Sequence, residues 1–213
     1  MKKICVFTFI AALALCAAQM SEAQATKDAK EANKLARDGA EASKNQEWDK
    51  AVDLLRKATA LDHKYAPNLA AVFQQRGYAA ATNQQFQDAI NDYGEAIKIN
   101  PEDARIYEQR AAVEMKLNDN DKALADYSEA IKLKPNDVRY YVYRSYIYET
   151  KGDIKNSMAD TDKVLKLDPK NQEAISRKKR LETLQSMRAT PPPPPPAAST
   201  KTSPAGAHTP HKP

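Results

Sequence analysis

The sequence predicts an all-α protein, an α-solenoid of about four helix hairpins followed by a C-terminal capping helix. Alanine, leucine, lysine, glutamate and glutamine, which favour helices, are abundant, while only five of the 213 residues are glycine. No run of residues reads as a β-strand. Prolines recur every 34 residues, at Pro67, Pro101, Pro135 and Pro169, and self-similarity at such a period indicates a repeat architecture.

The first 25 residues have the features of a secretory signal peptide. Residues 1–3 are a basic start, residues 4–18 are an apolar run shorter than the ~20 residues of a membrane span, and residues 23–25 (AQA) fit a cleavage site. We therefore expect an exported protein, periplasmic or secreted, whose mature chain has no membrane span. The alternative is lipid attachment at Cys16, which follows a sequence similar to a bacterial lipobox, although Leu15 replaces the usual small residue.

Composition excludes several functions for the mature chain. Both cysteines, Cys5 and Cys16, lie in the predicted leader, so neither a disulfide nor a thiolate site would remain. Removing the leader lowers the formal charge from +5 to +4, and two of the remaining lysines lie in the C-terminal tail. A folded body so close to neutral argues against nucleic-acid binding, which needs a dense basic patch.

Each repeat is predicted to contain two helices joined by a polar turn. In one unit the helices are expected over 104–117 and 122–133, and Pro135 then separates this unit from the next. Small and large residues recur at matching positions of three consecutive units: Phe73, Gly77, Ala89, Tyr93, Ala96 and Pro101; Tyr107, Ala111, Ala123, Tyr127, Ala130 and Pro135; and Tyr141, Ser145, Tyr148, Ser157, Val164 and Pro169.

This pattern resembles the tetratricopeptide repeat (TPR). The resemblance implies a folded array over residues 26–188 with a polar capping helix at its end. The expected units lie near residues 32–67, 70–103, 104–137 and 138–171, with the capping helix over 171–188. The first unit has four additional residues around 61–65, and because this is close to one helical turn, we expect its second helix to be one turn longer.

Arginine and aspartate recur together, 16 residues apart, in three of the units. The pairs are Arg76 and Asp92, Arg110 and Asp126, and Arg144 and Asp160. A binding site rarely repeats in every unit, whereas a packing contact does. We therefore interpret them as structural ion pairs, partly buried between the two helices of each hairpin. The alternative is a ladder of arginines that binds an acidic partner.

Five of the ten tyrosines lie in residues 139–148, RYYVYRSYIY. Tyr141 and Tyr148 are seven residues apart on one helix face and are expected in the core, while Tyr140 is left unassigned. The resemblance implies that other positions of each first helix line a concave groove that binds protein. These positions hold Tyr78, Arg105, Glu108, Gln109, Arg139, Val142, Tyr143, Tyr146 and Glu149. Exposed tyrosine beside arginine is typical of recognition surfaces, and ordinary solvated helix surface is the alternative.

One TPR subfamily holds the C-terminal carboxylate of a chaperone with a lysine and an asparagine of its first unit. Here Ala36 and Ala40 occupy those positions, so this clamp is absent.

The tail, residues 189–213, differs in composition. Six consecutive prolines at 191–196 predict a polyproline II rod of ~19 Å, at ~3.1 Å per residue, within an otherwise disordered segment. A spacer is the expected role. The alternatives are a ligand for an aromatic groove, or weak metal binding by His208 and His211.

No catalytic motif is present, and His63 is the single histidine outside the tail. The predicted function is an exported, non-catalytic TPR adaptor or scaffold that binds a protein or peptide segment in its groove, without metal or cofactor. The alternative is a lipid-anchored envelope protein that assists assembly of a secretion or pilus machine, and a spacer without any ligand is a third possibility. The oligomeric state and the identity of the partner are left open.

Overall fold

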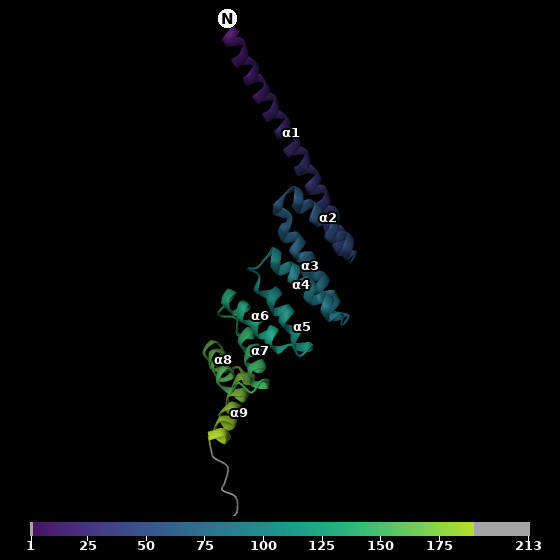
Figure 1. Ribbon diagram of the computed structural model, residues 1–213. Coiled ribbons are helices and arrows are strands. Elements are labelled where there is room, and N and C mark those ends of the chain that lie inside the picture. Colours follow the sequence, from purple (N-terminus) through teal and green to yellow (C-terminus); the bar gives the residue numbers. More distant parts are fainter. Residues whose placement is uncertain (1, 190–213) are drawn as a thin grey trace, which may run out of the picture.

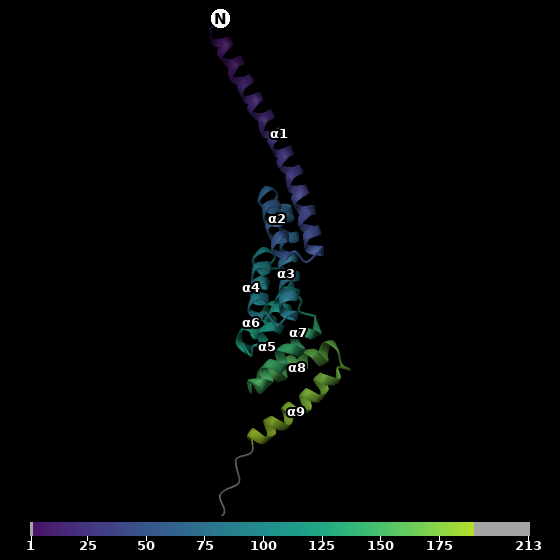
Figure 2. The same ribbon diagram turned by 90° about the vertical axis from the view of Figure 1, so that its right-hand side faces the viewer.

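The computed structural model describes residues 2–189, with side-chain surroundings for residues 19–188. Within this range the helices follow one another along an elongated array, with α1 projecting at one end and α9 at the other (Figures 1 and 2). The predicted proline-rich rod and the two tail histidines lie outside the described residues. None of the helices in the described part of the chain is long and apolar enough to span a bilayer.

Four helix hairpins and a final helix make up the array. They are α1 (Lys2–Lys44) with α2 (Trp48–Leu61), α3 (Ala66–Thr82) with α4 (Phe86–Ile99), α5 (Ala104–Lys116) with α6 (Asn120–Leu133), α7 (Val138–Thr150) with α8 (Ile154–Leu167), and then α9 (Gln172–Ala189). A 3-10 turn, η1 (His63–Tyr65), lies between the first two hairpins. The predicted all-α solenoid of four hairpins with a C-terminal helix is confirmed.

The array has two different faces because successive helices along the chain lie alternately on one side and the other. We call α1, α3, α5 and α7 the inner helices, and α2, α4, α6 and α8 the outer helices. The inner helices approach one another directly, α1 contacting α3 and α3 contacting α5, whereas no comparably close approach joins successive outer helices in the described range. The inner helices therefore lie together on one side of the array, which we call the concave side.

The four additional residues of the first repeat do not lengthen its second helix, so that prediction is wrong. Helix α2 has 14 residues, the same length as α4, and ends at Leu61. Asp62 is extended (φ −151°, ψ 111°), and its carboxylate accepts a hydrogen bond from the backbone N–H of Lys64 to begin η1. The extra turn belongs to α3, which has 17 residues against 13 in α5. Pro67 fits the first turn of α3 because that position needs no N–H partner.

Small residues of the outer helices and large residues of both layers fill the core. Ala51, Ala89 and Ala123 are fully buried at matching positions of the outer helices, and Phe73, Tyr93 and Tyr127 fill the space between the layers. The missing side chain of a glycine matters at one close approach of α3 and α4. A Cβ atom added at Gly77 would come within 3.1 Å of the Tyr93 ring and 3.2 Å of the Asp92 Cβ.

Helix α7 is buried on two faces, which corrects one prediction. Tyr141 is buried as expected, but Tyr148 is only partly buried, and the Arg144 guanidinium lies 5.9 Å from the centre of its ring. Tyr140 and Ile147, at 0% exposure, take the interior positions that face the preceding hairpin. The seven-residue spacing therefore predicts the burial of Tyr141 correctly but that of Tyr148 only in part, and Tyr140 and Ile147 occupy the most buried face.

Candidate functional site

Hydrogen bonds along the concave side link one inner helix to the next. Ser43 Oγ donates to Gln75 Oε1 at 2.7 Å, joining α1 to α3. Gln74 Nε2 donates to Gln109 Oε1 at 2.5 Å, joining α3 to α5. Between α5 and α7, Arg139 Nη1 donates to Glu108 Oε1 at 3.0 Å. These links fix the inner helices relative to one another, so the surface they form is organised before any ligand arrives.

Two hollows open on this side. The first, which we call the amide hollow, has a volume of about 600 Å³ and lies over α1, α3 and α5; its lining includes Ser43, Gln74, Gln75, Tyr78 and Gln109. The second, which we call the aromatic hollow, has a volume of about 360 Å³ and is lined by Glu108, Ala112, Met115, Lys116, Tyr127 and Tyr143. Four residues predicted for the groove, Tyr78, Glu108, Gln109 and Tyr143, therefore line one hollow or the other.

Three predicted groove tyrosines present large exposed areas. Tyr78 is 63% exposed, Tyr143 44% and Tyr146 47%. The ring of Tyr143 stacks on that of buried Tyr127, with centroids 5.5 Å apart, and this contact holds it in place. Because a tyrosine presents a large amphipathic area with few rotatable bonds, such residues are suited to recognition.

The predicted groove arginines are exposed but are occupied by carboxylates of this chain. Arg105 binds Asp103, which also accepts from the backbone N–H of Arg105 at the start of α5. Arg139 binds Asp137 in the same way, and reaches Glu108 as well. Burial raises the pKa of Glu108, and Arg139 partly offsets this effect.

Glu149 and Val142 belong to the attachment of α9 rather than to an open groove. Glu149 accepts from Arg180 Nε at 2.5 Å and from Arg177 Nε at 3.1 Å, and these bonds, with that of Arg180 the stronger, lower its pKa. Arg177 is buried and also donates to the Val142 carbonyl and to Ser145 Oγ. The sequence predicts only a polar capping helix here, so the inward contacts of Arg177 come from the structure.

Each of the three arginines that recur every 34 residues binds the aspartate 16 residues later through two hydrogen bonds. The distances are 2.9 and 2.7 Å for Arg76 and Asp92, 2.7 and 2.7 Å for Arg110 and Asp126, and 2.8 and 2.8 Å for Arg144 and Asp160. All three aspartates are buried. Each bond pair joins the two helices of one hairpin, so these arginines act within the fold rather than as a ladder on its surface.

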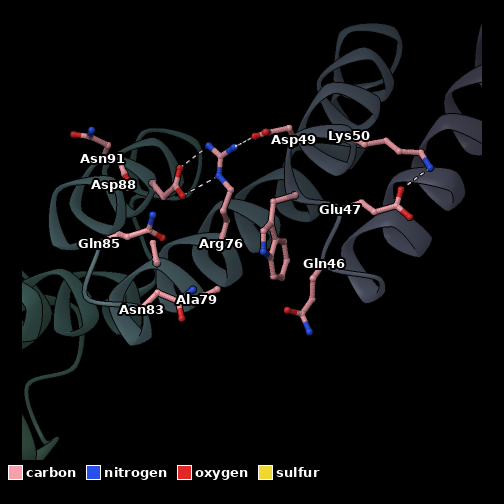
Figure 3. Close-up of a pocket in the computed structure, with 13 residues that line it drawn as sticks. Gln46, Glu47, Asp49, Lys50, Arg76, Ala79, Asn83, Gln85, Asp88 and Asn91 are labelled. Atoms are coloured by element: carbon pink, nitrogen blue, oxygen red, sulfur yellow. Dashed lines mark hydrogen bonds and ion pairs between the residues drawn. The ribbon is translucent and has the colours of Figure 1, made fainter.

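A further hollow lies away from this groove. It has a volume of about 840 Å³ and lies between α2 and the second hairpin, where Arg76 also donates to Asp49 at 2.7 Å (Figure 3). With Asp49 and Asp92 both bound, the Arg76 guanidinium links the first two hairpins. No three histidine, cysteine or acidic side chains in the described range are grouped so as to hold a metal ion.

Repeated hairpins of this size, with small residues at the crossings and a concave face of inner helices, define a TPR protein. The chain belongs to the ETO1 C-terminal domain family, whose sequence model matches residues 10–186. A comparison with curated protein sequences gave no match.

Solved structures share this fold. The TPR domain of Arabidopsis OM64 is 31% identical, and the match covers 55% of this chain and 98% of that domain with a TM-score of 0.51. YrrB, a TPR protein with an unusual peptide-binding site, is 18% identical over 78% of this chain and 84% of its own, with a TM-score of 0.57. The first TPR of Spaghetti (RPAP3), bound to the HSP90 peptide SRMEEVD, is 20% identical over 55% of this chain and 93% of its own, with a TM-score of 0.52.

Proposed function

We propose that this protein is an exported, non-catalytic adaptor that binds a segment of another protein along its inner helices. The observation that carries the proposal is the placement of three exposed tyrosines, Tyr78, Tyr143 and Tyr146, on the concave side of an otherwise well-packed array. Preorganised helices lose little conformational entropy when a segment binds to them. Peptide binding is described for two of the proteins that share this fold, which is consistent with the same use of the concave side here.

Removing two exposed side chains of the groove should weaken partner binding at least about tenfold, a loss typical of an interface hot spot. The variant is Tyr78→Ala with Tyr146→Ala, which removes two of the exposed tyrosines. Its partner is first recovered by affinity purification with the full chain, and the affinity is then measured by calorimetry. The matched control is Lys132→Ala with Leu133→Ala, two exposed residues of outer helix α6. Equal affinity of the groove variant and the wild type would refute the placement of the site.

The way α1 enters the array is compatible with removal of the leader. Residues 19–25 are exposed, and Ala32 is the first buried residue of α1 within the range where side chains are described. Cleavage after Ala25 would therefore remove no buried contact in residues 19–25. Lipid attachment at Cys16 would instead keep residues 19–25, which are exposed, as a spacer to the membrane surface.

The mass of the mature protein decides between these two forms. We expect intact-mass measurement of protein purified from the producing cell to give an N-terminus at Thr26. A mass corresponding to a start at Cys16 with attached acyl chains would instead establish the lipid-anchored form, the envelope protein of the alternative function. An unprocessed chain would refute export by either route.

A further inference from the structure

The arginines of the concave side are largely neutralised by this chain itself, whereas Lys44, which also lines the amide hollow, is exposed. Arg105 is held by Asp103, and Arg139 by Asp137 and Glu108, at distances of 2.8 to 3.1 Å. At the α9 end, Glu149 accepts bonds from Arg177 and Arg180. An acidic ligand would have to displace these carboxylates to reach the arginines, and hydrogen bonds already made would be lost in the exchange.

The amide hollow offers groups suited to a neutral polypeptide backbone. Gln74, Gln75 and Gln109 line it, and Gln75 is exposed. Each glutamine amide carries two N–H donors and an acceptor oxygen, so the single bonds of Gln74 to Gln109 and of Ser43 to Gln75 leave further capacity on both sides. A backbone presents the same donors and acceptors, which makes amide side chains complementary to an extended chain.

The aromatic hollow offers apolar contact instead. Ala112, Met115 and Tyr143 line it together with Tyr127, whose ring stacks on that of Tyr143. Methionine adapts its shape to irregular apolar partners. Lys116 also lines this hollow, but its ammonium lies 5.6 Å from the ring centre of Phe86 and so already has an attractive partner. A volume of about 360 Å³ accommodates an apolar side chain of the ligand.

We propose that the inner face selects an extended polypeptide segment without net charge, with glutamine amides bonding its backbone and one apolar side chain in the aromatic hollow. An acidic peptide is not its ligand. The inference rests on the proposed function, because it assigns a ligand chemistry to the same surface. It goes further by predicting that recognition is insensitive to salt, since screening weakens only charge-based binding.

The test is selection of peptides from a display library of random segments about 12 residues long, using the full chain as bait. We expect enriched peptides of near-zero net charge with one large apolar residue, whose affinities change less than about threefold between about 50 and 500 mM NaCl. The acidic peptide SRMEEVD is the comparison probe, and we expect no binding. Acidic consensus peptides, or a tenfold fall in affinity with salt, would overturn this inference while leaving the proposed function standing. Failure to enrich any peptide would refute both this inference and the proposed function.

A double variant and its control show whether the glutamine amides of the amide hollow contact the bound peptide. Gln74→Ala with Gln109→Ala should weaken binding of the selected peptide at least tenfold. The matched control is Gln87→Ala on outer helix α4, which removes a comparable exposed amide bonded to Asn91. Thermal melting of each variant shows that the array remains folded. Unchanged affinity in the double variant, with melting preserved, would contradict the role assigned to the amide hollow.

Discussion

Replacement of Asp160 by alanine should lower the free energy of unfolding by about 3 kcal/mol, as expected when one partner of a buried ion pair is removed. The Asp160 side chain is 8% exposed and accepts two hydrogen bonds from Arg144, whose side chain is 19% exposed. The variant leaves the Arg144 guanidinium in the hairpin interior with a single remaining side-chain acceptor, Ser128. Urea denaturation of the full chain measures the loss.

The same helix supplies a matched control for this experiment. Asp162 is half exposed and binds Lys178 at 2.8 Å on the surface, so Asp162→Ala should cost less than about 1 kcal/mol. Replacing both members of the buried pair, Arg144→Met with Asp160→Leu, should recover most of the stability because no charge is left unpaired. If Asp160→Ala and Asp162→Ala cost the same, the repeated pairs do not hold the hairpins together.

The second large effect concerns Glu114, a buried carboxyl group of α5. It is 3% exposed, and one of its oxygens has no hydrogen-bond partner. Burial, followed by the nearby charge of Asp126, raises the pKa of Glu114 to about 7; Asp119 raises it further, and Arg110 and Lys122 lower it. The protonated form is therefore the one that the folded hairpin favours.

The sign of the pH effect follows from this raised pKa. The unfolded chain releases the proton near pH 4.5 and the folded chain near pH 7, so the stability contributed by protonated Glu114 is complete below about pH 4.5 and is lost as the pH rises to about 7. Glu114→Gln should remove this dependence and stabilise the protein at pH 8 by up to about 3 kcal/mol. Exposed Glu102→Gln is the control, and denaturation midpoints at pH 5 and pH 8 are the measurement. A Glu114→Gln variant no more stable than wild type at pH 8 would contradict this account.

The repeat makes much of the fold predictable, because each position of the repeat occurs in several units of the same sequence. A small residue at Gly77, Ala111 and Ser145 indicates a close helix approach more firmly than any one of them alone. The arginine–aspartate spacing was informative for the same reason. Repetition, however, says nothing about features that occur once.

Features specific to one unit were the ones that sequence reasoning missed. Glu114 lies where neighbouring units have Ala80 and Tyr148, so its burial could not be inferred from its own charged side chain. Arg177 belongs to a basic run of four residues in which only the rotation of α9 determines which side chain points inward. The sequence does not assign Tyr140 to either environment, because a helix packed between two hairpins is apolar on both faces and has weak amphipathic character.

The most direct test of the central claim is site-specific photo-crosslinking in the producing cell. A photoreactive residue is placed at Tyr146, on inner helix α7, or at Lys155, an exposed position of outer helix α8 in the same hairpin. We expect a crosslinked partner protein from position 146 and none from position 155. Crosslinks from position 155 alone, or equally from both positions, would contradict a concave binding face.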